Sequence, residues 1–145
     1  MSTNTQPTNG AGATAAGFWD DAEVISMYTR AQAIEDGVLV DASIGELAPI
    51  SRHLYRFPVA MTAEVFAIIQ RAVENKRADN SLAGVWHDIM WMSRMRVYAR
   101  PDPSTVLFTV KIRGAGRRQI YAFKLVCGPG DNAEPVMTLM LPDQD

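Results

Sequence analysis

Apolar and polar residues alternate through the last third of the chain, as they do in strands with one buried face. This period of two predicts strands over residues 106–112, 119–126 and 136–141. Glycine-rich turns at Gly114–Gly116 and Gly128–Asn132 separate the strands. Because the connections are short, we expect an antiparallel C-terminal β-meander.

The middle of the chain follows a helical period instead. Thr62 is expected to cap a helix that fades in the polar stretch 75–80. Ser81 is expected to cap a second helix, which Pro101 ends. The inner side of this second helix is predicted to carry Leu82, Val85, Trp86, Ile89, Met90, Ser93 and Val97.

Residues 24–42 are expected to extend the meander by one or two strands. The β-rich segments are 24–29 and 38–40. A short helix over 30–36 lies between them, with Thr29 as its N-cap and Gly37 as its stop.

The elements together predict an α+β fold with an antiparallel C-terminal meander, added N-terminal strands and two main helices on one face. Residues 44–56 stay open, because Pro49 interrupts any helix that begins at Ser43. Residues 1–17 have almost no large apolar side chain, so we expect a flexible leader followed by a single domain over 18–145.

Composition excludes several classes of protein. The 145 residues are 48% apolar and 21% charged with a net charge of −2, which argues against a disordered chain and a globally basic nucleic-acid binder. The single cysteine, Cys127, indicates a reducing, cytoplasmic location. We find no membrane span, secretory signal, cofactor motif or metal-ligand spacing, and the oligomeric state stays open.

The modest net charge conceals a strong segregation of charge. Residues 1–50 carry seven acidic side chains and one basic, and residues 126–145 carry four acidic and none basic. Residues 51–125 carry thirteen basic side chains and five acidic. The chain therefore has a basic middle between acidic ends.

The outer side of the second helix is one candidate contact surface. His87, Trp91, Arg94 and Tyr98 recur at intervals of four, three and four residues, which places them on one stripe. If Trp86 is buried, Trp91 must point partly away from the core, and exposed Trp, Tyr and Arg often anchor interfaces. The alternative is that Trp91 packs beneath the N-terminal segment or the sheet edge.

The basic region Arg94–Arg118 is the second candidate, with seven basic residues and one acid. The hairpin should present four of these around its tip: Lys111, Arg113, Arg117 and Arg118. They could contact an acidic protein or a phosphate backbone. They could equally pair with the acidic segments of the same molecule.

No catalytic constellation is evident. His87 and Asp88 are adjacent on a helix and point about 100° apart, so we do not expect them to pair. Cys127 is interpreted as a small core residue. Tyr28–Arg30 leaves a transferase or hydrolase as a third functional option.

Several segments resemble an uncharacterised bacterial family of small proteins associated with plasmids, phages and integrated elements. The longest are Tyr28–Asp41 (YTRAQAIEDGVLVD) and Lys124–Asp131 (KLVCGPGD), the latter continuing through residues 135–142. Phe57–Thr62 and Trp86–Met92 follow the same pattern.

The resemblance implies a biological context and no particular catalytic activity. Small mobile-element proteins often inhibit or modify host defence systems. We therefore expect a non-catalytic protein that binds a host protein or ribonucleoprotein, of the anti-CRISPR or antirestriction type. The expected contacts are Trp91, Arg94, Tyr98, Lys111, Arg113, Arg117 and Arg118. An accessory nucleic-acid-binding protein that uses Arg94–Arg118 is the alternative.

Overall fold

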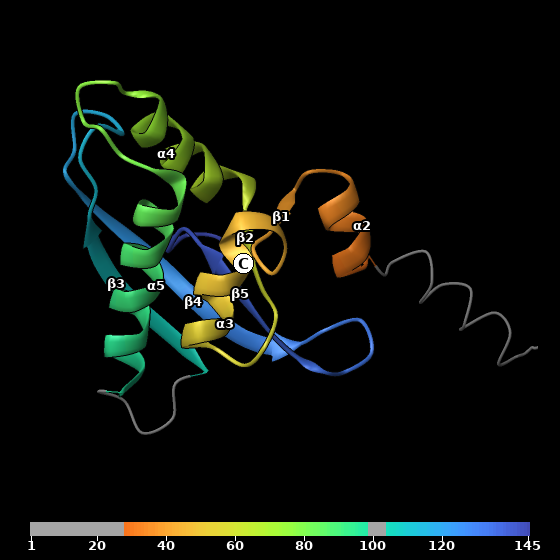
Figure 1. The fold of residues 1–145 in the computed structure, drawn as a ribbon. Coiled ribbons are helices and arrows are strands. Elements are labelled where there is room, and N and C mark those ends of the chain that lie inside the picture. The colour runs from red at the N-terminus through yellow and green to blue at the C-terminus, as the bar shows by residue number, and fades with distance from the viewer. Residues whose placement is uncertain (1–27, 99–103) are drawn as a thin grey trace, which may run out of the picture. The chain divides into compact units, whose positions relative to one another are not determined.

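A computed structural model describes residues 28–98 and 104–145 of the chain. The chain divides into two compact units, Met1–Gln32 and Ala33–Asp145. The second unit holds a five-stranded sheet with helices, so the fold class is α+β, as predicted (Figure 1).

Helix α2 (Arg30–Glu35) begins with the predicted cap. The backbone N–H of Gln32 donates to Thr29 Oγ1 at 3.0 Å, and the Thr29 N–H donates to Gln32 Oε1 at 2.9 Å. Two N–H groups without a helical acceptor are thereby satisfied reciprocally. The predicted leader and most of the predicted strand 24–29 lie outside the described residues, and residues 28 and 29 are not in a strand.

The sheet has the order β1-β2-β5-β4-β3. All neighbouring strands run antiparallel except β2 and β5, which are parallel. The predicted antiparallel meander is confirmed. In sheet order the strands are β1 (Leu39–Asp41), β2 (Val59–Thr62), β5 (Pro135–Met140), β4 (Ile120–Pro129) and β3 (Thr105–Lys111).

The sequence prediction missed β2, which lies inside the sheet and joins β1 to the meander. All four β2 residues are buried, so the strand has no alternation between apolar and polar positions. Its parallel partner β5 lies more than seventy residues further along the chain, with Ala60 opposite Thr138. Pairing between strands so far apart in the chain leaves no pattern in the local sequence.

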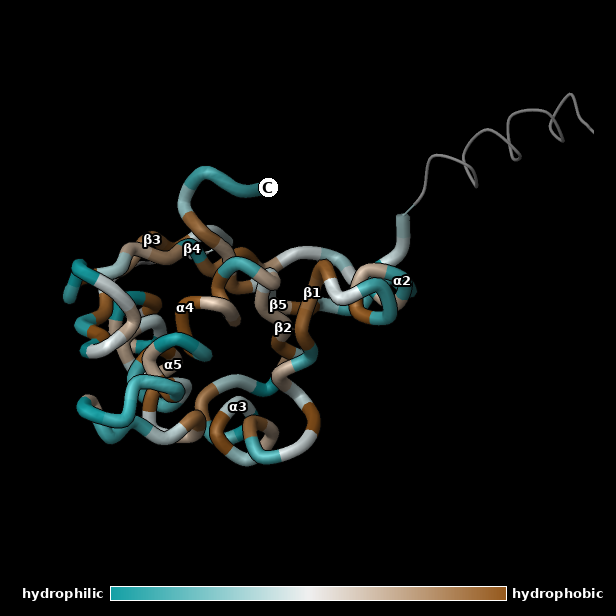
Figure 2. The backbone as a smooth tube through the Cα atoms, turned by 90° about the horizontal axis from the view of Figure 1, so that it is seen from above, coloured by the Kyte–Doolittle hydropathy of each residue, from teal (hydrophilic) through white to brown (hydrophobic). Residues whose placement is uncertain are grey.

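The two predicted main helices cover one face of the sheet together with a third helix (Figure 2). They are α3 (Ala48–Leu54), which follows a short turn of 3₁₀ helix at Gly45–Leu47, then α4 (Ala63–Glu74) and α5 (Leu82–Tyr98). The unexpected helix is α3, because Pro49 lies in its first turn. A proline there sacrifices no hydrogen bond, since first-turn N–H groups have no helical acceptor.

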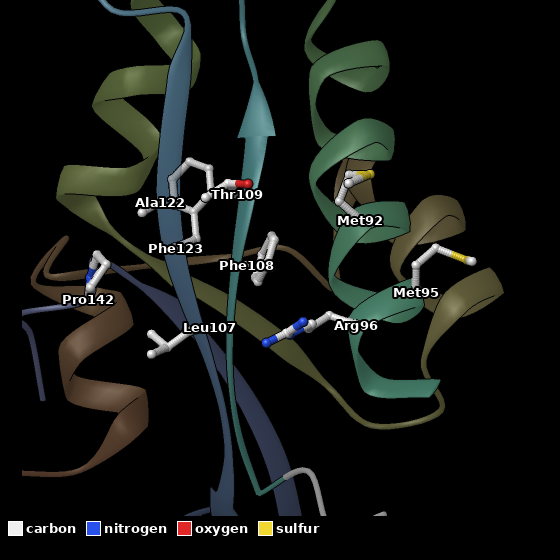
Figure 3. Close-up of a pocket in the computed structure, with 9 residues that line it drawn as sticks. All are labelled: Met92, Met95, Arg96, Leu107, Phe108, Thr109, Ala122, Phe123 and Pro142. Atoms are coloured by element: carbon white, nitrogen blue, oxygen red, sulfur yellow. The ribbon is translucent and has the colours of Figure 1, made fainter. Parts of the chain in front are cut away.

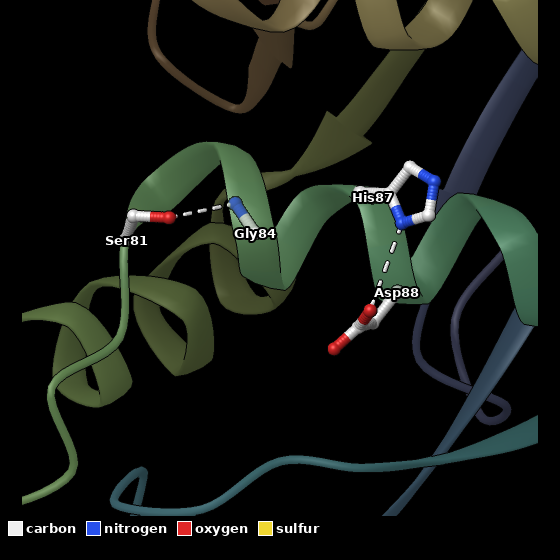
Figure 4. Close-up of polar contacts among 4 residues, drawn as sticks. All are labelled: Ser81, Gly84, His87 and Asp88. Atoms are coloured by element: carbon white, nitrogen blue, oxygen red, sulfur yellow. Dashed lines mark hydrogen bonds and ion pairs between the residues drawn. The ribbon is translucent and has the colours of Figure 1, made fainter.

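The core lies between these helices and the sheet. Trp86, Ile89 and Met90 of α5 are fully buried, as are Phe123 of β4 and Leu139 of β5. Exposure alternates along β3, so every second side chain faces the helices. The predicted caps are confirmed: Thr62 Oγ1 accepts from the Val65 N–H at 3.4 Å, and Ser81 Oγ accepts from the Gly84 N–H at 2.9 Å (Figure 4).

The C-terminal segment lies on the opposite face of the sheet from the helices (Figure 2). Gln144 holds it there. Its carbonyl accepts from Lys124 Nζ, and its side-chain Oε1 accepts from Thr62 Oγ1 and the Leu141 N–H, each at 2.9 Å. Gln144 Nε2 donates to Glu64 Oε1 at 2.9 Å, so the segment is tied to strands and to α4.

Candidate interaction surface

The tip of the β3–β4 hairpin is held firmly by α4 and the loop that follows it. Asn80 Nδ2 donates to the Arg113 carbonyl at 2.7 Å, and Asn75 Nδ2 donates to the Gly114 carbonyl at 3.2 Å. Arg71 Nε donates to the Ala115 carbonyl at 2.8 Å. Three successive carbonyls of the tip are thus fixed by side chains from outside the hairpin. No local sequence pattern indicates this bracing.

The tip displays the predicted cationic side chains. Lys111, Arg113, Arg117 and Arg118 are all exposed. Within residues 28–98 and 104–145, none of the four lies within 4.0 Å of a carboxylate oxygen. The described acidic residues therefore do not neutralise them, and their charges face solvent.

Two of these residues also line a cavity of about 610 Å³. Arg117 and Arg118 share its wall with Arg71, Tyr121 and Asp143. The wall holds three guanidinium groups against one carboxylate, so the cavity is cationic. An acidic group that entered it would find several donors converging.

The predicted stripe on α5 is present in its first part. His87 and Trp91 stack with ring centroids 6.2 Å apart, and Trp91 is 47% exposed, so it does not pack into the core. Arg94 is half-buried, with its guanidinium 5.3 Å from the centre of the Tyr55 ring. Tyr98 is the last residue of α5, and its side chain lies outside the described set.

The structure does not gather the predicted residues into one site. Arg117 and Arg118 line the cavity beside Arg71, whereas Arg94 lines a different cavity beside α3. The stripe and the hairpin tip are therefore two separate features of the surface.

His87 and Asp88 approach each other more closely than their helical positions predict. Their Nδ1 and Oδ1 atoms are 3.7 Å apart (Figure 4). This corrects the expectation that they do not pair. Both side chains are more than half exposed, however, and an exposed pair at this distance contributes little to stability.

An apolar surface that was not predicted from the sequence lies beside strand β3. Met92 and Met95 of α5 and Leu107 of β3 are exposed, and with Arg96 and Phe108 they line a cavity of about 650 Å³ (Figure 3). Leu107 is 54% exposed and belongs to the face of β3 that points away from the core. The pattern of alternation could have revealed it, since Val106 and Phe108 face the core.

Strand β3 is also an edge of the sheet among the described residues. The Ile112 N–H donates to the Gln119 carbonyl and the Cys127 N–H donates to the Ser104 carbonyl, each at 2.8 Å. Hydrogen-bonded pairs alternate in an antiparallel ladder, so even-numbered residues of β3 bond to β4. The N–H and C=O groups of Leu107 and Thr109 therefore point away from β4, where another strand could pair with them.

His, Cys and acidic side chains do not gather into a metal-binding cluster in the described regions. Residues 28–98 and 104–145 contain no group of three or more His, Cys, Asp or Glu side chains arranged to hold a metal ion. Cys127 is partly buried and packs against the core. Thr29, part of the third functional option, uses its side chain to cap α2. No helix among the described residues is long and apolar enough to cross a membrane.

Comparison with known proteins supplies a family but no activity. No curated protein and no solved structure matches the chain. A family model described as a family of unknown function (DUF6573) matches residues 15–145, nearly the whole chain. The predicted resemblance to an uncharacterised family is confirmed at that level. Because this match covers far more than half of the chain, the chain belongs to this family of unknown function, DUF6573.

Proposed function

We propose that this is a non-catalytic interaction protein, which binds an acidic surface of another protein through the tip of its β3–β4 hairpin. One observation carries the proposal. Lys111, Arg113, Arg117 and Arg118 are exposed without a carboxylate within 4.0 Å in the described residues, on a turn that three outside side chains hold in place. A preorganised tip loses little conformational freedom when it binds.

An acidic protein suits this surface better than a nucleic acid. Proteins that bind phosphate backbones neutralise many phosphates over a broad basic footprint. Here the basic tip belongs to a chain with a net charge of −2 and acidic residues toward both ends. The hairpin matches a compact acidic patch, because a small number of cations is enough to neutralise such a patch.

The resemblance to mobile-element proteins supports a more specific role. On that basis the partner is a host protein or ribonucleoprotein, such as a component of a defence complex, and binding inhibits or modulates it. The protein would then act in the cytoplasm. Obstruction of the partner, rather than a reaction, would be the mechanism.

The proposal is tested by comparing two variants that each remove three exposed arginines. Arg113→Ala/Arg117→Ala/Arg118→Ala alters the tip, and Arg52→Ala/Arg56→Ala/Arg96→Ala alters exposed arginines elsewhere. Each tagged protein is used for affinity capture from a bacterial lysate at about 50 and 200 mM salt. We expect a specific protein to bind wild type and the second variant, but not the tip variant, and to bind less at higher salt.

Titration against duplex DNA and single-stranded RNA under the same conditions examines the nucleic-acid alternative. Salt-sensitive binding that disappears in the tip variant would favour that alternative. Capture of the same protein by the wild type and the tip variant alike would contradict the proposed role of the hairpin.

A further inference from the structure

A cavity of about 540 Å³ lies where the C-terminal ends of α3 and α5 meet strands β4 and β5. Four of its lining side chains carry or can accept a positive charge: Arg52, His53, Arg56 and Arg94. The described residues that line it include no Asp or Glu. It is separate from the hairpin tip, which contacts the loop before α5 rather than the end of that helix.

Hydrogen bonds within the fold hold Tyr55, which lines this cavity. The Tyr55 ring is buried, and its hydroxyl is 2.8 Å from Ser93 Oγ, which itself donates to the Met90 carbonyl at 2.7 Å. The guanidinium of Arg94 lies 5.3 Å from the centre of that ring, a cation–π distance. Arg94 is therefore positioned by contacts within the fold.

Helix electrostatics explain only part of this concentration of charge. Arg52 and His53 lie in the last turn of α3, where the helix dipole favours cations. Arg56 lies beyond the end of that helix, and Arg94 belongs to α5. Like charges that line one partly enclosed space repel each other, and an anion bound near Arg52 and Arg56 would reduce that repulsion.

The remaining walls of the cavity are apolar. Val97, Cys127 and Met137 line it, and all three are at least partly buried. Phe57 also lines the cavity and is 37% exposed, so part of its ring is open to contact. The volume falls within the usual range for small-molecule sites, roughly 300–1,000 Å³.

We propose that this cavity binds a small phosphate monoester that carries a planar aromatic ring, that is, a ligand of the nucleoside monophosphate class. The guanidinium groups of Arg52 and Arg56, which are exposed, match the phosphate, because a guanidinium can donate two parallel hydrogen bonds to it. The aromatic ring of the ligand packs against Phe57 and the apolar wall. This site is additional to the proposed function and does not depend on it.

Titration calorimetry with adenosine 5′-monophosphate, adenosine and inorganic phosphate tests the site in the full chain. We expect saturable binding of the monophosphate, weaker binding of phosphate and the weakest binding of adenosine. Arg52→Ala/Arg56→Ala should weaken monophosphate binding by about tenfold or more, since it removes charge-assisted hydrogen bonds. Lys76→Ala/Arg77→Ala removes two exposed cations from the loop after α4 and should leave binding within about twofold.

Phe57→Ala distinguishes the contribution of the ligand's ring to binding from that of its phosphate. It should weaken binding of the monophosphate while leaving the affinity for inorganic phosphate unchanged. Thermal unfolding of each variant verifies that the protein remains folded. Failure of the monophosphate to bind at millimolar concentration would overturn the proposal, as would equal affinity for adenosine or unchanged binding in Arg52→Ala/Arg56→Ala.

Discussion

Trp86 donates its indole N–H to Ser51 Oγ at 3.0 Å, in the interior between α5 and α3. Both side chains are buried, and Ser51 Oγ donates in turn to the Ala42 carbonyl at 2.7 Å. One hydroxyl thus satisfies two polar groups that the core would otherwise leave without a partner. It also fixes α3 against the helix that carries the exposed Trp91.

Ser51→Ala should therefore lower the free energy of unfolding by about 1–3 kcal/mol. It leaves the Trp86 N–H and the Ala42 carbonyl buried without this partner. Urea denaturation measures the loss, and Ser104→Ala, at an exposed position, serves as the control with a change within about 0.5 kcal/mol. Equal stability of the two variants would show that the hydroxyl is not needed.

The two tryptophans of α5 should respond differently to the same substitution. Trp86 is fully buried and hydrogen-bonded, whereas Trp91 is exposed and stacked on His87. We expect Trp86→Phe to lower the free energy of unfolding by about 1–3 kcal/mol and Trp91→Phe to change it by about 0.5 kcal/mol or less. Urea denaturation of both variants makes the comparison, and a larger loss for Trp91→Phe would contradict the assignment.

Gly114 should tolerate alanine worse than Gly37 does. Both have positive φ, at 89° and 80°, so alanine is strained by about 1–2 kcal/mol at either position. A Cβ on Gly114 would also lie 2.6 Å from Ala78 Cβ, whereas one on Gly37 meets nothing within 4 Å. We expect a larger loss of unfolding free energy for Gly114→Ala in urea. Similar losses would mean that the turn shifts freely, which the bracing of the tip argues against.

The contact between Gln144 and Glu64 should be visible in a pH titration. The hydrogen bond from Gln144, followed by that from the backbone N–H of Glu64, holds the pKa of the Glu64 carboxyl below its usual 4.5. Gln144→Ala should raise this pKa, but not fully, because the backbone hydrogen bond remains. Carboxyl chemical shifts followed by NMR over an acidic pH series measure it.

The same contact gives stability a defined pH dependence. A carboxyl with a lowered folded pKa contributes stability that is present above 4.5 and is lost as the pH falls through the folded pKa. At neutral pH, the ionised Glu64 carboxyl should therefore add more to the free energy of unfolding in the wild type than in Gln144→Ala. This difference should disappear in acid, where the carboxyl is protonated. An unchanged Glu64 pKa in the variant would remove the basis of this prediction.

The sequence predicted the elements whose signals are local. The meander follows from alternation along residues 106–141, and α4 and α5 follow from helical spacing with Thr62 and Ser81 at their caps. The exposure of Trp91 follows from its spacing relative to Trp86. In each case the period of the pattern reports on neighbours only a few residues away, which is why local sequence sufficed.

The candidate sites were less accessible to sequence reasoning. The hairpin arginines were foreseen as a basic cluster, but their bracing by Arg71, Asn75 and Asn80 joins residues far apart in the chain. Arg52 and Arg56 lie in a segment that Pro49 had left undecided, so their convergence with Arg94 could not be anticipated. Nothing in the spacing of these residues indicates that they share a cavity.

The sequence by itself determined the α+β class, the local order of most elements and the segregation of charge, because periodicity, caps and composition are properties of short segments. Only the tertiary structure decided that β2 joins β1 to the meander through parallel pairing with β5. It alone separated the stripe on α5 from the hairpin tip and placed three arginines around one cavity. The physical reason is that burial and charge act through space, between groups whose separation along the chain carries no periodic signal.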